Sequence, residues 1–158
     1  MQIRKVKQTD NEQLAKIIRQ AFIEYNAPQH GTVYSDPTTD DLYTLFQTEG
    51  AVLWVAILDG EIVGCCGVYP TSGLPEHYAE LVKFYLAANA RGKGVGKALM
   101  QQSIDSAIAL GYSTLYLESL PQFSNAVSIY EKQGFETLNH PLGESGHTSC
   151  NIWMIKKL

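Results

Sequence analysis

Few cysteines occur in this chain, and they form no pattern. Its 158 residues include three, of which Cys65 and Cys66 are adjacent and Cys150 is distant. Adjacent residues of a strand point to opposite faces, so we do not expect the pair to act as one site. An odd number of cysteines without the spacing of a disulfide framework excludes a disulfide-stabilised secreted domain. It favours a protein of a reducing compartment.

Long apolar runs and an excess of positive charge are also missing. No apolar stretch reaches the roughly 18 residues that a membrane helix needs, and the short polar N-terminus is unlike a signal peptide. Acidic residues number 16 against 12 basic ones, giving a net charge of −4 and no basic footprint for nucleic acid. We therefore predict a cytoplasmic protein that binds neither a membrane nor a nucleic acid.

Histidines are few and lack the spacing of metal ligands. His30, His77, His140 and His147 all fall in polar segments that are predicted to be loops. Solvent exposure is the simplest interpretation, and contact with a substrate is the alternative, because loops often carry specificity. We predict no metal cofactor.

Hydrophobic periodicity predicts an α/β fold with a mixed sheet. The elements follow in the order strand, two helices, three strands, helix, strand, helix and two strands. The expected strands are 3–7, 51–58, 61–69, 79–86, 113–119, 135–138 and 151–156, and the expected helices are about 9–22, 39–47, 97–110 and 125–133. A chain of this length is expected to form one domain.

The same order predicts six or seven strands, mostly antiparallel, with about four helices. Asp59-Gly60 is a dipeptide preferred in two-residue hairpin turns. The strand-helix-strand crossover over 79–119 should be parallel and right-handed. Ligands of such sheets bind near the carboxyl ends of parallel strands, so the segment after residue 86 is a predicted binding site.

The segment Arg91-Gly92-Lys93-Gly94-Val95-Gly96-Lys97 lies at that place and is the most informative in the chain. Glycine lets backbone N–H groups approach a ligand, and a helix N-terminus adds partial positive charge, so the segment predicts a phosphate or pyrophosphate site. It is not a P-loop, because Arg91 and Ala98 replace the required glycine and hydroxyl. It is not a dinucleotide fingerprint, because Lys97 and Leu99 stand where glycine or alanine is required. The alternative is that the glycines only allow the chain to turn into the following helix and bind no ligand.

A strand, the pattern R-x-x-G-x-G and a helix together resemble the coenzyme A loop of the GNAT acetyltransferases. The segment Tyr130-Glu131-Lys132-Gln133-Gly134-Phe135 resembles the Y-E-K-x-G-F segment of that family, and Glu80 lies in the strand before the loop. The three pieces occur in the family's order. The resemblance implies a single N-acetyltransferase domain over residues 1–158, with acetyl-CoA as co-substrate and a primary amine as acceptor.

The resemblance also implies which residues bind coenzyme A. Backbone N–H groups of the glycine loop would bind the pyrophosphate, with added charge from Lys97. The pantetheine arm would pair with the strand edge, where the N–H of Tyr85 or Leu86 would polarise the thioester carbonyl. The expected coenzyme A-binding residues are Phe84, Tyr85, Leu86, Arg91, Gly92, Lys93, Gly94, Val95, Gly96, Lys97, Asn125 and Tyr130.

One departure from the family concerns the pattern N-x-x-A-x-x-x-Y, whose asparagine contacts coenzyme A. Ala126 and Tyr130 fit the pattern, but Phe123 stands at the asparagine position. Either Asn125 substitutes from nearby or the contact is missing.

Two residues are expected to be catalytic. Glu80 lies in an apolar strand, which should raise its pKa and let it take a proton from the amine, directly or through water. A surface ion pair with Lys83 is the alternative for Glu80. Tyr130 stands where the family places a tyrosine hydroxyl near the sulfur, and it would protonate the leaving thiolate. A core tyrosine is the alternative for Tyr130.

No cysteine stands at a motif position, so we predict direct transfer in a ternary complex. A small amine or amino-acid-like acceptor is slightly favoured over a protein. A sensor that binds acyl-CoA without chemistry is the alternative function, and a donor longer than acetyl stays open. Dimers are common among the resembling proteins, which makes a homodimer a further expectation.

Overall fold

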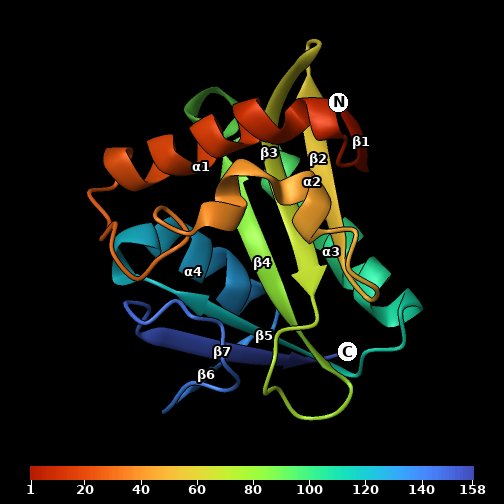
Figure 1. Ribbon diagram of the computed structural model, residues 1–158, viewed down its shortest axis with the longest axis vertical. Coiled ribbons are helices and arrows are strands. Elements are labelled where there is room, and N and C mark those ends of the chain that lie inside the picture. The colour runs from red at the N-terminus through yellow and green to blue at the C-terminus, as the bar shows by residue number, and fades with distance from the viewer.

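A computed structural model describes residues 1–158 as a seven-stranded sheet with helices on both faces (Figure 1). The strand order is β1-β2-β3-β4-β5-β7-β6, and only the β4–β5 pair is parallel. The strands are β1 (Gln2–Lys5), β2 (Val52–Leu58), β3 (Glu61–Tyr69), β4 (Tyr78–Leu86), β5 (Thr114–Ser119), β6 (Glu136–Leu138) and β7 (Ile152–Lys157). The predicted α/β class, element order and mostly antiparallel sheet are confirmed.

The α-helices are α1 (Asn11–Glu24), α2 (Leu42–Leu45), α3 (Val95–Ala109) and α4 (Ser124–Lys132), and the 3-10 turns are η1 (Gln8–Asp10), η2 (Pro37–Asp40), η3 (Ala88–Ala90) and η4 (Pro121–Phe123). The single helix predicted over 39–47 is wrong, because Asp41 interrupts it with φ −142° and ψ 65°. Instead, two short helices, η2 and α2, each begin after an aspartate that caps the first turn. Asp36 accepts from Thr38 N, and Asp41 accepts from Thr44 N. None of the helices has the length and apolar character required to span a lipid bilayer.

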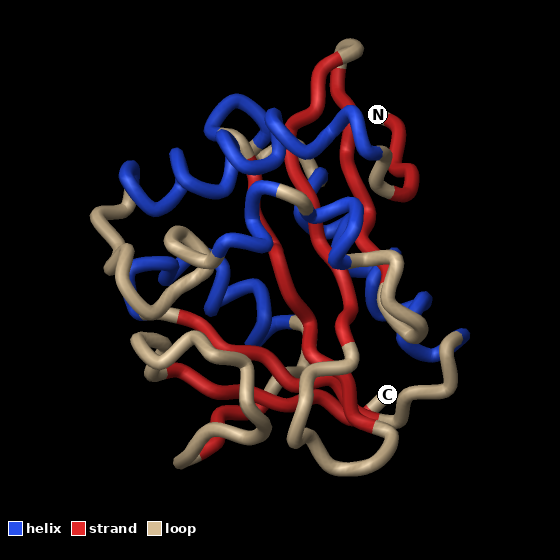
Figure 2. The backbone as a smooth tube through the Cα atoms, viewed as in Figure 1, coloured by secondary structure: helices blue, strands red, loops and turns tan.

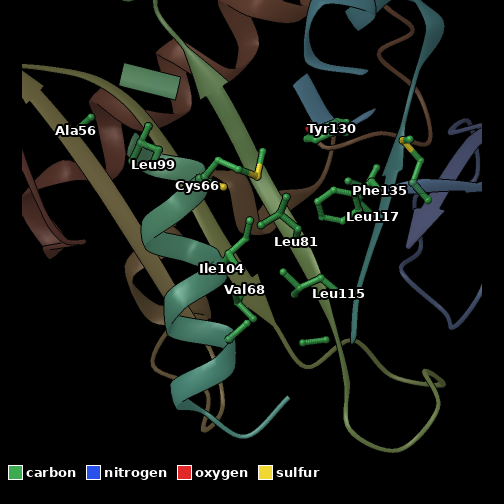
Figure 3. Close-up of a cluster of buried hydrophobic side chains, with 14 of the residues drawn as sticks. Ala56, Cys66, Val68, Leu81, Leu99, Ile104, Leu115, Leu117, Tyr130 and Phe135 are labelled. Carbon is green, nitrogen blue, oxygen red and sulfur yellow. The ribbon is translucent and has the colours of Figure 1, made fainter. Parts of the chain in front are cut away.

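Two apolar cores lie on the two faces of the sheet. Under α3 and α4, buried side chains of α3 such as Leu99 and Ile104 pack on Cys66, Val68 and Leu81 (Figure 3). Under α1 and α2, the second core contains Leu14, Ile18, Phe22, Leu42 and Phe46. Each fully buried side chain of this size stabilises the fold by roughly 1.5–3 kcal/mol, so the sheet is held firmly from both sides.

The parallel strands β4 and β5 separate partway along their length. They pair only at Tyr78–Thr114, Ala79–Leu115 and Glu80–Tyr116. Figure 1 shows the two strands close together near the C-terminus and apart further along. Residues 81–86 of β4 therefore have no strand beside them on the β5 side, and such an edge leaves backbone groups free to pair with a ligand.

A bulge in β4 accompanies this separation. Val82 pairs with Gly67 and Tyr85 pairs with Cys65, so Lys83 and Phe84 together oppose one residue of β3. Lys83 has φ +56°, a left-handed conformation that costs a non-glycine residue roughly 1–2 kcal/mol. Simple alternation would place residue 83 on the α3 side of the sheet. The bulge turns it to the opposite side, near the carboxylate of Glu80.

Candidate active site

The glycine loop leads from the end of β4 into α3. Gly94 is the N-cap residue of α3 and has φ +79°, which favours glycine strongly. Gly96 lies in the first turn, where a Cβ would be 3.1 Å from Leu86 Cδ1 and 3.2 Å from Phe84 Cζ. The absence of a side chain at Gly96 therefore lets the start of α3 lie directly against the end of β4. The helix begins at Val95, two residues before the predicted start.

The backbone N–H groups of residues 92–97 donate to no acceptor in the protein. Free N–H groups are normal in the first turn of a helix, but here they continue back through the loop. Together with the helix dipole they form a site for an anion. The loop and the helix start lie where the glycine pattern predicted them, and phosphate binding there stays a prediction.

The side chain of Arg91 has a structural partner. Its guanidinium donates to both carboxylate oxygens of Glu24 at 2.5 and 2.9 Å and to Leu86 O at 3.0 Å. It also lies 4.9 Å from the centre of the Tyr25 ring. These contacts join the start of the loop to the end of α1, so the side chain of Arg91 positions the loop.

A cavity of about 410 Å³ lies between the end of β4, the glycine loop and α4. This volume is typical of a small-molecule site. The structure brings most of the predicted coenzyme A-binding residues to its wall, namely Phe84, Tyr85, Leu86, Arg91, Gly92, Gly94, Gly96, Lys97 and Asn125. Three others lie elsewhere. Val95 is buried in the core, Lys93 is exposed beside the cavity wall, and Tyr130 lines a second cavity.

The second cavity measures about 70 Å³ and lies where β4 and β5 separate. Glu80, Lys83, Glu118 and Tyr130 contribute to its wall, together with residues of two loops. The two cavities share wall residues, which are Phe84, Tyr85, Phe123 and Ala126. A ligand that extends along the free edge of β4 would therefore connect the anion site to Glu80 and Tyr130.

Glu80 is 5% exposed and accepts a hydrogen bond of 2.6 Å from Thr71 Oγ1. Burial raises its pKa to about 7, and the nearby carboxylate of Glu118 acts in the same direction. The Thr71 hydrogen bond and the charge of Lys83 oppose this rise. A carboxyl group with such a pKa can take up and release a proton near neutral pH.

Tyr130 lies on α4 with its ring centre 5.9 Å from those of Phe84 and Phe135 (Figure 3). It is 7% exposed, and burial raises the pKa of its hydroxyl well above the ordinary value. The hydroxyl makes no hydrogen bond within the protein, and the residue lines the second cavity. It is therefore protonated at neutral pH and free to donate a proton or a hydrogen bond.

Two loops contribute Thr32, Val33, His147 and Cys150 to the wall of the second cavity. The loops contact each other, and Figure 2 shows their backbones in tan. Residues 25–36 follow α1, and residues 139–151 join β6 to β7. His147 Nε2 lies 2.9 Å from Asp36 Oδ2, and Ser149 N donates to Gly31 O at 3.0 Å. The loop after β6 is also bound to the sheet, since Ser145 Oγ donates to Glu118. We call these two segments the cover loops.

Phe123, which stands at the position of the family asparagine, belongs to an aromatic cluster. Its ring centre lies 5.1 Å from that of Phe22, 5.7 Å from Tyr25 and 6.1 Å from Tyr85. Phe123 thus packs α4 and its preceding turn against α1 and β4. Asn125 lines the larger cavity, and its contact with coenzyme A stays a prediction.

The sequence alone did not assign site roles to Lys83, Asp36 or His147, which the structure places together. Of the four histidines only His147 lines the second cavity. No local pattern marks these residues, because the β4 bulge and the pairing of the cover loops bring them together from distant parts of the chain. The local signals at this end of the site were the apolar context of Glu80 and the loop position of His147, for which substrate contact was the alternative.

Comparisons with known proteins agree with this geometry. The sequence pattern of the Acetyltransferase (GNAT) family matches residues 17–135. The uncharacterised N-acetyltransferase YjgM of Escherichia coli strain K12 is 34% identical over 157 residues, covering 99% of this chain and 94% of that protein.

Solved structures show the same fold. A GNAT-family acetyltransferase from Staphylococcus aureus Mu50 has a TM-score of 0.86 at 20% identity, with 99% of this chain and 98% of that chain covered. A phosphinothricin acetyltransferase of Sinorhizobium meliloti, solved in complex with AcCoA, has a TM-score of 0.78 at 18% identity, with 99% and 88% covered.

Fold and relatives together define the class of the protein, which is an acetyltransferase enzyme. This chain belongs to the acetyltransferase (GNAT) family. The relationship inferred from the R-x-x-G-x-G loop and the YEKQGF segment is thereby confirmed.

Proposed function

We propose that this enzyme moves an acetyl group from acetyl-CoA to a primary amine by direct transfer in a ternary complex, within one domain over residues 1–158. The observation that carries the proposal is the row of free N–H groups over 92–97, beside a cavity that shares four wall residues with the cavity of Glu80 and Tyr130. The AcCoA complex of the fold relative from Sinorhizobium meliloti supports the donor.

The residues present fit the donor in two ways. The anion site at the start of α3 suits its pyrophosphate, and Lys97 in the first turn adds a positive charge. The free edge of β4 suits its extended arm, with the N–H of Tyr85 or Leu86 directed at the thioester carbonyl. Asn125 would contact the arm from α4.

The acceptor enters as an ammonium, because an ordinary alkylamine has a pKa near ~10.4. It loses one proton before attack, and Glu80 takes this proton directly or through water. The nitrogen then forms its bond to the acyl carbon as the carbon–sulfur bond breaks. Tyr130 protonates the leaving sulfur, and the second proton lost by nitrogen restores Tyr130, directly or through solvent. Glu80 then releases its proton to solvent.

A small amine or amino-acid-like acceptor is favoured over a protein. The cavity beside Glu80 holds about 70 Å³, which is room for a few water molecules or the head of a small substrate. The cover loops enclose it and are bound to each other. A polypeptide would have to displace these contacts, whereas a small molecule would not.

Two measurements test the proposal. Calorimetry should detect binding of coenzyme A, and release of free thiol from acetyl-CoA should depend on an added amine from a mixed panel. A coenzyme A complex without thiol release for any amine would favour the acyl-CoA sensor. No binding of coenzyme A would remove both functions.

A further inference from the structure

We infer that Lys83 binds a carboxylate of the acceptor, so that the acceptor is an amine that also carries a carboxylate, as a free amino acid does. This inference rests on the proposed function and adds the substrate class to it. It is carried by the position of one buried cation.

Three charged side chains are buried in this protein, and two of them have partners. Asp10 pairs with Arg4 Nη1 at 2.7 Å, and Glu80 accepts from Thr71. Lys83 is 7% exposed, yet its ammonium makes no hydrogen bond and no ion pair in the structure. Burial lowers the pKa of Lys83 because it disfavours the charged form, and a ligand that supplies a carboxylate would offset this cost.

The charged neighbours of Lys83 do not bond to it. Asp36, Glu80 and Cys65 are the titratable groups that face it. Asp36 already accepts from Thr38 N at 2.9 Å, from Thr38 Oγ1 at 2.7 Å and from His147 Nε2 at 2.9 Å. These groups interact with Lys83 through space but accept no hydrogen bond from it. All three N–H donors of its Nζ therefore remain available to another acceptor.

The backbone supports a functional role for this position. The left-handed conformation at Lys83 is unfavourable for lysine and is maintained by the bulge in β4. Without the bulge the side chain would point into the apolar core beneath α3. Residues in such a conformation often lie at binding and catalytic sites, where the surrounding structure maintains them.

The wall of the second cavity has charges that match a zwitterion. Glu80 presents a carboxylate on β4 with one oxygen free of protein donors, and an ammonium would bind beside it. Glu118 on β5 already accepts from Tyr116 Oη and Ser145 Oγ and adds only its negative charge. Lys83 presents the opposite charge from the same strand as Glu80. An amino acid held between them would place its nitrogen at the proposed base and its carboxylate at the unpaired ammonium.

The test compares L-amino acids with their primary amides, which lack the carboxylate, and expresses rates per concentration of free amine because amidation lowers the pKa of the amine. We expect kcat/KM for the free acids to exceed that for the amides by roughly 10- to 100-fold, the range of a lost charge-assisted hydrogen bond. Lys83→Met keeps the length of the side chain and should abolish this preference by raising KM for the acids only. Lys16→Met, on the exposed face of α1, is the matched control and should keep the preference.

Equal rates for acids and amides in the wild type would overturn the inference, as would acetylation restricted to amines without a carboxylate. Both results leave the proposed function standing. An equal loss for acids and amides in Lys83→Met would also overturn it, because a merely structural lysine would behave in that way.

If no member of the panel is acetylated while coenzyme A binds, the proposed function fails, and binding then decides the inference. Free amino acids, but not their amides, should raise the melting temperature of the wild-type coenzyme A complex and leave that of the Lys83→Met complex unchanged. The absence of a difference between acids and amides would overturn the inference.

Discussion

Thr71 donates a hydrogen bond to one carboxylate oxygen of Glu80, and the other oxygen receives no donor from the protein. The bonded oxygen fixes the carboxyl at the last paired position of β4 and β5. The free oxygen is left to exchange a proton with a substrate or water. Because the pKa of this carboxyl is raised to about 7, its charge state changes near neutral pH.

The first prediction is a pH profile of the reaction. For the wild type we expect kcat/KM to rise with pH through an inflection near 7, as Glu80 loses its proton. Glu80→Gln should lower kcat/KM by about 10²-fold or more and remove this inflection. Thr71→Val should move the inflection to higher pH, because the Thr71 hydrogen bond lowers the pKa of Glu80. An unchanged profile in Glu80→Gln would assign the base to another group.

The second prediction concerns stability. The folded protein raises the pKa of Glu80 from 4.5 to about 7, so it favours the protonated carboxyl. The resulting stabilisation is complete below pH 4.5 and is lost as the pH rises through 7. Glu80→Gln cannot ionise, so relative to the wild type it should gain on the order of 3 kcal/mol in free energy of unfolding between pH 4.5 and pH 8. Urea denaturation at the two pH values measures this, with the exposed Glu61→Gln as a control that should show no such gain.

Local sequence predicted the parts of the fold that depend on local rules. The apolar stripe of α1, the Asp59-Gly60 hairpin and the glycine loop before α3 all appear where their patterns indicated. Each depends on residues within one or two turns of each other. The sequence therefore predicted where the glycine loop lies, and binding of the donor by this loop stays a prediction.

At the acceptor end, the sequence marked Glu80 by its apolar strand and left substrate contact open for the loop histidines, of which His147 lines the cavity. Lys83 reaches the cavity because of a bulge in which β3 and β4 lose register, and no pattern within β4 marks that position. Asp36 and His147 are 111 residues apart in the chain and meet only when the cover loops pack together. Similarly, the interruption at Asp41 depends on side-chain caps that compete with the apolar spacing of 39–47.

The third prediction tests the tyrosine. Tyr130→Phe removes a hydroxyl that bonds to nothing in the protein, so stability should change by less than about 1 kcal/mol. Loss of the general acid should lower kcat by about 10²-fold. Affinity for coenzyme A, measured by calorimetry, should stay within about 2-fold, since the glycine loop and the edge of β4 would make most of its contacts. Turnover at the wild-type rate would remove Tyr130 from the mechanism.

The fourth prediction separates backbone strain from loss of the anion site. Gly94 has φ +79° and Gly60, in the β2–β3 hairpin, has φ +81°, and a Cβ at either position meets no atom within 4 Å. Alanine at either site should therefore lower the free energy of unfolding by a similar amount, about 1 kcal/mol.

Only Gly94→Ala should weaken coenzyme A binding, by about 10-fold or more, because relief of the strain turns the free N–H groups of Val95 and Gly96 away from a common anion. Calorimetry with coenzyme A and urea denaturation measure the two effects separately. Equal coenzyme A affinities in Gly94→Ala and Gly60→Ala would contradict the assignment, because the loop before α3 would then contribute no more to binding than a remote turn that carries the same strain.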